Sequence, residues 1–259
     1  MASEIGVAYS LEAIGVIYLK MGDLMAAQKS FQDAHEIYER NQHRIGMAGI
    51  TNRFGQIAMA KNELPQAIKR FKTAYEASLG VDVETEINSL NKWGWTFVVQ
   101  DQWEEAIPFL EKAIERARQV HDHYQRAESL VDLAFVLEHL ELYEQSQQAM
   151  QEAEAIASEY NYYYLLGLAE VSRGDNAYNA GNYQEAFKHF GIHCYYMALY
   201  NPVEYEKAVR KTTSLLFNLS VQTIPSVVAD LKAYWSSVEL KEKDLFLNAL
   251  DEVDLLIGL

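Results

Sequence analysis

The chain has 259 residues, of which 49% are hydrophobic and 12% aromatic, so it can bury a substantial core and is not a disordered segment. Its 37 acidic and 22 basic residues give a net charge of −15, so the field of the chain as a whole repels duplex nucleic acid and anionic membranes. Its single cysteine, Cys194, excludes an intrachain disulfide.

The first predicted element is a helical hairpin within residues 11–34. Apolar or small residues recur at gaps of three and four on both sides of a Met-Gly-Asp turn, which places each set on one helix face. The first set is Leu11, Ile14, Gly15 and Tyr18, and the second set is Leu24, Ala27, Phe31 and Ala34. The stretch therefore predicts two antiparallel helices.

The same pattern returns four times along the chain. Its turn residues are Gly22, Asn62, Asp101, Glu141 and Gly181, at intervals of 40, 39, 40 and 40 residues. Small residues recur in the first helix of each copy (Gly15, Gly55, Gly94, Ala134, Gly174), and bulky residues recur in the second (Phe31, Phe71, Leu110, Met150, Phe190). Helices approach closely where a large side chain enters a notch left by a small one, so we expect stacked hairpins.

These residues resemble the tetratricopeptide repeat family over roughly residues 5–200. The resemblance implies an all-α fold, an α-α superhelix of five hairpins at about 3–40, 41–80, 81–120, 121–160 and 161–200. The usual repeat has 34 residues, and we expect the extra residues here to lengthen the helices and the loops between hairpins.

The pattern degrades after Asn201. Residues 203–219, 224–235 and 240–257 read as three further helices, so residues 201–259 are predicted to form a divergent sixth hairpin and a capping helix. An end unit must cover the last exposed core face, which explains a divergent sequence there.

We find no motif for catalysis, such as a phosphate-binding glycine loop, Gly-x-Ser-x-Gly or His-Glu-x-x-His. His189 and His193 lie four residues apart beside Cys194, a spacing that can bind a metal. We expect instead that His193 packs and His189 faces solvent. The sequence thus predicts no metal, no cofactor and no enzyme, and only Asp132, Glu138 and His139 come near a catalytic set.

The family resemblance implies that the first helices line an inner groove, and this identifies candidate partner-binding residues. They are Asn52, Arg53, Gln56, Asn91, Lys92, Trp95, Phe135, Glu138, His139, Tyr178 and Asn179. Stacked asparagines can clamp an extended peptide backbone, because a side-chain amide both donates and accepts hydrogen bonds. Arg53 and Lys92 can hold a carboxylate, and Trp95 and Phe135 offer apolar anchors.

We therefore expect a non-enzymatic module that binds a protein or peptide, with no nucleic acid and no membrane as partner. The alternative is a regulatory sensor segment of a larger bacterial signalling ATPase or peptide-responsive regulator, which such 40-residue units resemble. The tyrosine-rich stretches 160–164 and 195–196 suit either an interface or packing between repeats. Self-association through the fifth repeat or the C-terminal helix is also open.

The chain has no apolar run of about 18 residues and no signal-peptide pattern at its N-terminus. A single cysteine fits a reducing compartment. We therefore expect a cytoplasmic protein.

Overall fold

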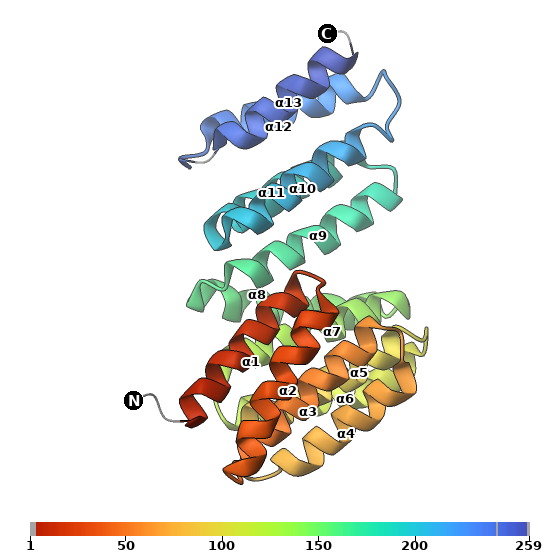
Figure 1. Ribbon diagram of the computed structural model, residues 1–259. Coiled ribbons are helices and arrows are strands. Elements are labelled where there is room, and N and C mark those ends of the chain that lie inside the picture. Colours follow the sequence, from red (N-terminus) through yellow and green to blue (C-terminus); the bar gives the residue numbers. More distant parts are fainter. Residues whose placement is uncertain (1–3, 242, 258–259) are drawn as a thin grey trace. The chain divides into compact units, whose positions relative to one another are not determined.

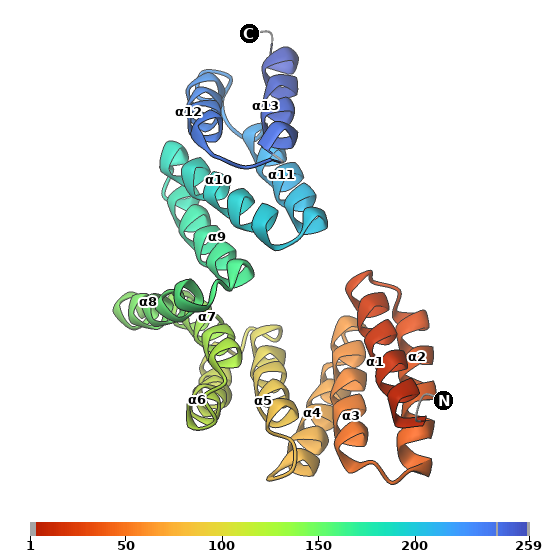
Figure 2. The same ribbon diagram turned by 90° about the vertical axis from the view of Figure 1, so that its left-hand side faces the viewer.

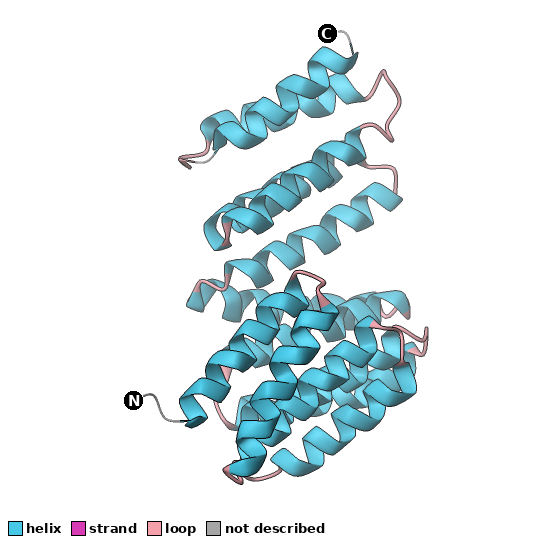
Figure 3. Cartoon of the chain, viewed as in Figure 1, coloured by secondary structure: helices cyan, strands magenta, loops and turns pink. Residues whose placement is uncertain are grey.

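The computed structural model describes residues 4–241 and 243–257, and these ranges contain helices and turns without strands (Figure 3). The described helices are α1 (Glu4–Lys20), α2 (Leu24–Arg40), α3 (Arg44–Ala60), α4 (Leu64–Ser78), α5 (Val83–Val98), α6 (Trp103–Gln119), α7 (His123–His139), α8 (Tyr143–Tyr160), α9 (Tyr163–Asn179), α10 (Tyr183–Tyr200), α11 (Pro202–Leu216), α12 (Ile224–Ser237) and α13 (Lys243–Ile257). The predicted all-α class is confirmed.

The chain divides into two compact units, residues 1–149 and residues 150–259. In the first unit the first helices of successive hairpins contact one another, α1 with α3, α3 with α5 and α5 with α7 (Figure 1). The division falls inside α8, whereas the sequence suggested a change at residue 200. The reason is that α10 and the C-terminal helices share one apolar core.

Every turn of the repeat region uses a residue in the left-handed conformation. The predicted turn residues Gly22, Asn62, Asp101, Glu141 and Gly181 have φ of 78°, 60°, 58°, 60° and 78°. The turns between hairpins use the same geometry, with φ of 52° at Gln42, 56° at His121 and 57° at Asn161. The loops between hairpins, 41–43, 79–82, 120–122 and 161–162, are of similar length to the turns within hairpins, such as 21–23 and 99–102. The expectation of longer loops was therefore wrong, and the extra residues lengthen the helices.

Glu141 is a suitable position to test this turn geometry. A left-handed φ of 60° is costly for a residue with a Cβ, so Glu141→Gly should raise the free energy of unfolding by about 0.5–1 kcal/mol. Urea unfolding measures the change. Glu144→Gly, three residues on and inside the first turn of α8, is the control and should lower the free energy of unfolding by about 1 kcal/mol. Stabilisation by both substitutions, or by neither, would contradict the assignment.

The predicted notches between paired helices are present. A Cβ built on Gly15, Gly55 or Gly174 would lie 2.4, 2.6 or 2.4 Å from the nearest ring atom of Phe31, Phe71 or Phe190. The three phenylalanines are buried, so each ring is held against the backbone of the facing helix. Contacts of this kind fix the two helices of a hairpin against each other.

The second unit is built around α10, which contacts α9, α11 and α12 (Figure 2). Trp235 of α12 is fully buried there, with its ring 5.9 Å from Tyr205 of α11 and 4.8 Å from Phe246 of α13. The C-terminal helices thus cover the core face that α10 leaves open. No helix in the described part of the chain is long and apolar enough to cross a membrane.

Candidate functional site

A cleft of about 540 Å³ opens where the first helices α1, α3 and α5 of the first unit meet. We call it the inner cleft. The residues that line it include Tyr9, Glu12 and Val16 of α1, Gly49, Asn52 and Arg53 of α3, and Asp82, Glu84, Thr85 and Asn88 at the start of α5. Gly49 lines the cleft without a side chain, and a Cβ there would meet only Glu12 and Thr85, at ordinary contact distances of 3.7 and 3.8 Å.

The charge of the inner cleft is acidic. Arg53 lies among Glu12, Asp82 and Glu84, and its Nε is 3.4 Å from Oε1 of Glu12. The Tyr38 hydroxyl donates to the other Glu12 oxygen at 3.3 Å, and burial together with Glu12 raises the pKa of Tyr38. We expected Arg53 to hold a carboxylate of a partner. In the structure Arg53 is paired with Glu12, and with Asp82 and Glu84 the lining carries more acidic than basic side chains.

The two asparagines expected to clamp a peptide are buried between helices, with Asn52 2% and Asn91 1% exposed. Asn52 Nδ2 donates to Ser89 Oγ at 2.8 Å, which joins α3 to α5. Ser129 Oγ lies 3.0 Å from Asn91 Oδ1, which joins α5 to α7 in the same way. Gln56 Nε2 completes this ladder by donating to Asn52 Oδ1 at 2.7 Å. The ladder therefore sets the packing of successive first helices.

Replacing Asn91 tests this packing role. Asn91→Ala removes the contact between α5 and Ser129, whose hydroxyl keeps its hydrogen bond to the Gln125 carbonyl at 2.7 Å, so we expect the free energy of unfolding to fall by about 0.5–1.5 kcal/mol. Asn88→Ala, on the same helix but only partly buried, should stay within about 0.5 kcal/mol of the unchanged protein. Thermal and urea unfolding measure both. If the two variants were equally stable, Asn91 would have no role in packing α5 against α7.

Three other predicted residues come together in one aromatic cluster. Ring centroids are 5.6 Å apart for Trp95 and Phe135, and 4.7 Å apart for Phe135 and His139. Trp103 joins them, stacked on the His139 ring at 4.0 Å, and the sequence did not mark it as a site residue. The cluster joins the end of α7 to α5 and to the first turn of α6, and its members are only partly buried or exposed.

Lys92 of α5 faces acidic residues of α7. Burial raises the pKa of the Asp132 carboxyl to about 7, while Lys92 acts to lower it and Glu128 acts to raise it further. Asp132 is thus protonated over a range in which a solvated aspartate is charged. Glu138, on the same helix, is partly buried.

Two predicted residues, Tyr178 and Asn179, belong to the second unit. Tyr178 packs its ring against Tyr183 at 5.3 Å and against Phe187 at 6.3 Å, and Asn179 is exposed at the end of α9. Of the tyrosine-rich stretches, Tyr164, Tyr195 and Tyr196 are partly buried against the core of this unit. These three tyrosines serve packing.

The histidines near Cys194 have protein partners. His189 was expected to face solvent, which is wrong, because its side chain is 17% exposed and its Nδ1 lies 2.7 Å from Glu170. His193 Nδ1 is 2.9 Å from the Gly167 carbonyl, and burial lowers its pKa. Burial raises the pKa of the Cys194 thiol to about 12. Within residues 4–241 and 243–257, no three His, Cys, Asp or Glu side chains gather in a way that could hold a metal ion.

Comparison with known proteins agrees with this architecture. Residues 85–159 match the tetratricopeptide repeat family model. No curated protein matches the chain by sequence. The hairpins, turns and notches define a helical-repeat scaffold, and residues 85–159 of this scaffold are similar to tetratricopeptide repeats, as predicted.

Solved structures share this fold at low sequence identity. Aspartyl phosphate phosphatase F from Bacillus subtilis has a TM-score of 0.63 at 16% identity, covering 98% of this chain and 70% of that chain. A Rap protein in complex with competence and sporulation factor has a TM-score of 0.62 at 14% identity, covering 100% and 78%. A signal transduction ATPase with a tetratricopeptide repeat sensor from Pyrococcus horikoshii has a TM-score of 0.63 at 17% identity, covering 97% and 39%.

Proposed function

We propose that this chain is a non-enzymatic interaction module that binds a segment of another protein, or a peptide, in the inner cleft. The observation that carries the proposal is a cleft of about 540 Å³ walled by three successive first helices and lined by three carboxylates. Since Arg53 already holds Glu12, the cleft favours a segment with a lysine or arginine side chain. The structural relative with a bound competence and sporulation factor supports a protein or peptide as ligand.

Further predicted residues extend this proposed surface along α5 and α7. Lys92, Trp95, Phe135, Glu138 and His139 are partly buried or exposed, and aromatic side chains in such positions are typical anchors of interfaces. Asn52 and Asn91 act in the proposal only by positioning the helices that carry the surface.

The absence of catalysis is part of the proposal. The His139 ring is stacked on Trp103 and packed on Phe135, while Asp132 faces Lys92, so their contacts do not join them into one acid–base pair. The phosphatase from Bacillus subtilis shares the fold at 16% identity, which does not extend its activity to this chain.

A charge reversal in the inner cleft tests the proposed function. Proteins captured from a bacterial lysate by the unchanged chain should be lost with Glu84→Lys, which places a cation in the cleft. Glu39→Lys, at an exposed position of α2 outside the cleft, is the matched control and should retain them. Identical capture by all three proteins would reject the inner cleft as the binding site.

A second candidate function is that of a regulatory sensor segment in a larger bacterial signalling protein. The observation in its favour is the signalling ATPase with a tetratricopeptide repeat sensor, of which this chain spans 39%. We also propose that the protein acts in the cytoplasm, which its single buried cysteine supports. A native gene that encodes an ATPase or DNA-binding part on the same chain would establish the sensor role, and a free-standing gene would favour an adaptor.

Self-association remains a proposal, and exposure favours the C-terminal helix as its site. Leu255 and Leu256 of α13 are 77% and 74% exposed, whereas most tyrosines of the fifth hairpin pack inward. Size-exclusion chromatography with light scattering, comparing the unchanged chain with a Leu255→Glu, Leu256→Glu variant, decides between a dimer and a monomer.

A further inference from the structure

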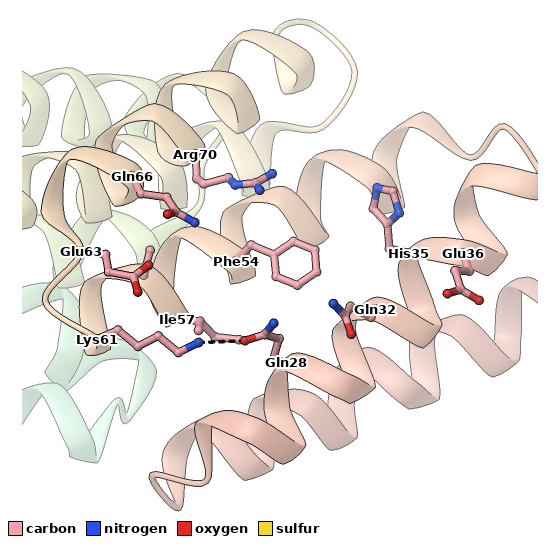
Figure 4. A pocket seen from close by; sticks show the side chains of 11 residues that line it. Gln28, Gln32, His35, Glu36, Phe54, Ile57, Lys61, Glu63, Gln66 and Arg70 are labelled. Carbon is pink, nitrogen blue, oxygen red and sulfur yellow. Dashed lines mark hydrogen bonds between the residues drawn. The ribbon is translucent and has the colours of Figure 1, made fainter.

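A second cleft, of about 560 Å³, lies on the side of the first unit formed by the second helices α2 and α4. We call it the outer cleft. Figure 4 shows Phe54 of α3 at its floor, between Gln32 and His35 of α2 and Arg70 of α4. None of the candidate residues of the inner cleft lines it.

The hairpin of α5 and α6 has aromatic residues at positions where the hairpin of α3 and α4, beside the outer cleft, has none. The residues 39 positions after Phe54, Ala58 and Arg70 are Trp93, Phe97 and Phe109. There the Phe109 ring packs on Trp93 at 4.6 Å and stacks on Phe97 at 5.4 Å. Three aromatic rings thus pack together between α5 and α6. At the corresponding positions between α3 and α4, Phe54 has an alanine and an arginine as neighbours in place of the other two rings.

Phe54 itself has polar neighbours on the side of the outer cleft. The Arg70 guanidinium carbon lies 5.7 Å from the centroid of the Phe54 ring, and the His35 ring lies at 6.4 Å. Because the ring is only partly buried, the part that Arg70 and His35 leave uncovered can contact a further aromatic side chain. The volume of the cleft is ample for one ring and the backbone that carries it.

The charges of the outer cleft differ from those of the inner cleft. Arg70 and Lys61 form no ion pair with any residue that the structure describes, and Lys61 Nζ instead donates to Gln28 Oε1 at 2.8 Å. Glu36 and Glu63 also belong to the lining, on α2 and at the start of α4. Two cations without acidic partners, in a chain of net charge −15, favour an anionic ligand group near Arg70.

We propose that the outer cleft binds an extended protein segment that places an aromatic side chain on Phe54 and an adjacent acidic side chain at Arg70. The occupant supplies the ring that Phe109 supplies in the next hairpin. The amides of Gln32 and Gln66, on the two walls, both donate and accept and so suit the backbone of such a segment. This site is independent of the inner cleft, and either site can fail alone.

The test is an NMR titration of the whole chain with an acetylated and amidated Gly-Glu-Phe-Glu-Gly peptide. We expect saturable shifts of amide resonances in α2 and α4, and about tenfold weaker binding when alanine replaces phenylalanine in the peptide. Arg70→Phe copies Phe109 into the cleft and should abolish the shifts. Lys69→Phe adds the same ring at the neighbouring exposed position and should leave them unchanged.

Two further measurements separate this proposal from other outcomes. Arg70→Glu should lose the acidic peptide and gain a Gly-Lys-Phe-Lys-Gly peptide, a reversal that a misfolded variant cannot show. Glu84→Lys, which disables the inner cleft, should leave the titration unchanged. The proposal is overturned by absent shifts at millimolar peptide, by equal binding of the alanine peptide, or by shifts that survive Arg70→Phe.

Discussion

Gly55→Ala should lower the free energy of unfolding by about 1–3 kcal/mol, although alanine is the better helix former. The new Cβ would lie 2.6 Å from the ring of Phe71, which is fully buried and has no room to withdraw. Either the ring leaves its position or α3 moves away from α4, and both changes open gaps in a closely packed core.

The same helix contains a matched control for this substitution. A Cβ on Gly49 would meet only the Glu12 and Thr85 oxygens, at 3.7 and 3.8 Å, which are ordinary contact distances. Gly49→Ala should therefore raise the free energy of unfolding by about 0.5–1 kcal/mol through helix propensity. Urea unfolding followed by circular dichroism measures both variants. If the two substitutions changed stability in the same direction, Gly55 would not be a packing notch.

Asp132→Asn should stabilise the protein at pH 8 by about 1–3 kcal/mol and have little effect at pH 4. The pKa of Asp132 is about 7 in the folded chain, against 3.8 as its ordinary value, chiefly because the carboxyl is buried. Between these two values the folded chain keeps a proton that the unfolded chain has released. Raising the pH through this window therefore destabilises the fold, and asparagine removes the effect because it never ionises.

The measurement is the difference in the free energy of unfolding between Asp132→Asn and the unchanged protein as a function of pH. This difference reports on the Asp132 carboxyl alone, because all other groups titrate in both proteins. The pKa of about 7 already includes the opposing effect of Lys92. Asp132 is only partly buried, so solvent should make the stabilisation smaller than the full displacement of the pKa implies. Glu128→Gln is the control. Glu128 raises the pKa of Asp132, so without its charge the loss of stability with rising pH should be complete at a lower pH. A difference in stability that stays constant from pH 4 to pH 8 would show that Asp132 titrates normally.

The first helices of the hairpins show the limit of prediction from sequence. Asn52 and Arg53 line the inner cleft as the predicted offset requires, but the side chains of Asn52 and Asn91 are buried and bonded to the next helix. A signal was present, because Ser89 and Ser129 follow the two asparagines at spacings of 37 and 38 residues, as paired positions on successive first helices would. Asp82 and Glu84 were missed because they lie at the very start of α5, before its periodic pattern begins.

The sequence alone determined the helical hairpins, their 40-residue period, the left-handed turn residues and the glycine notches. These features depend on neighbours within one hairpin, where turn chemistry and the helical period are decisive. Only the tertiary structure decided which polar residues are buried, that Arg53 is already paired and that Phe54 is only partly covered. These features depend on how one hairpin meets the next, because the same residue type is solvated or enclosed according to the packing of side chains about 40 positions away.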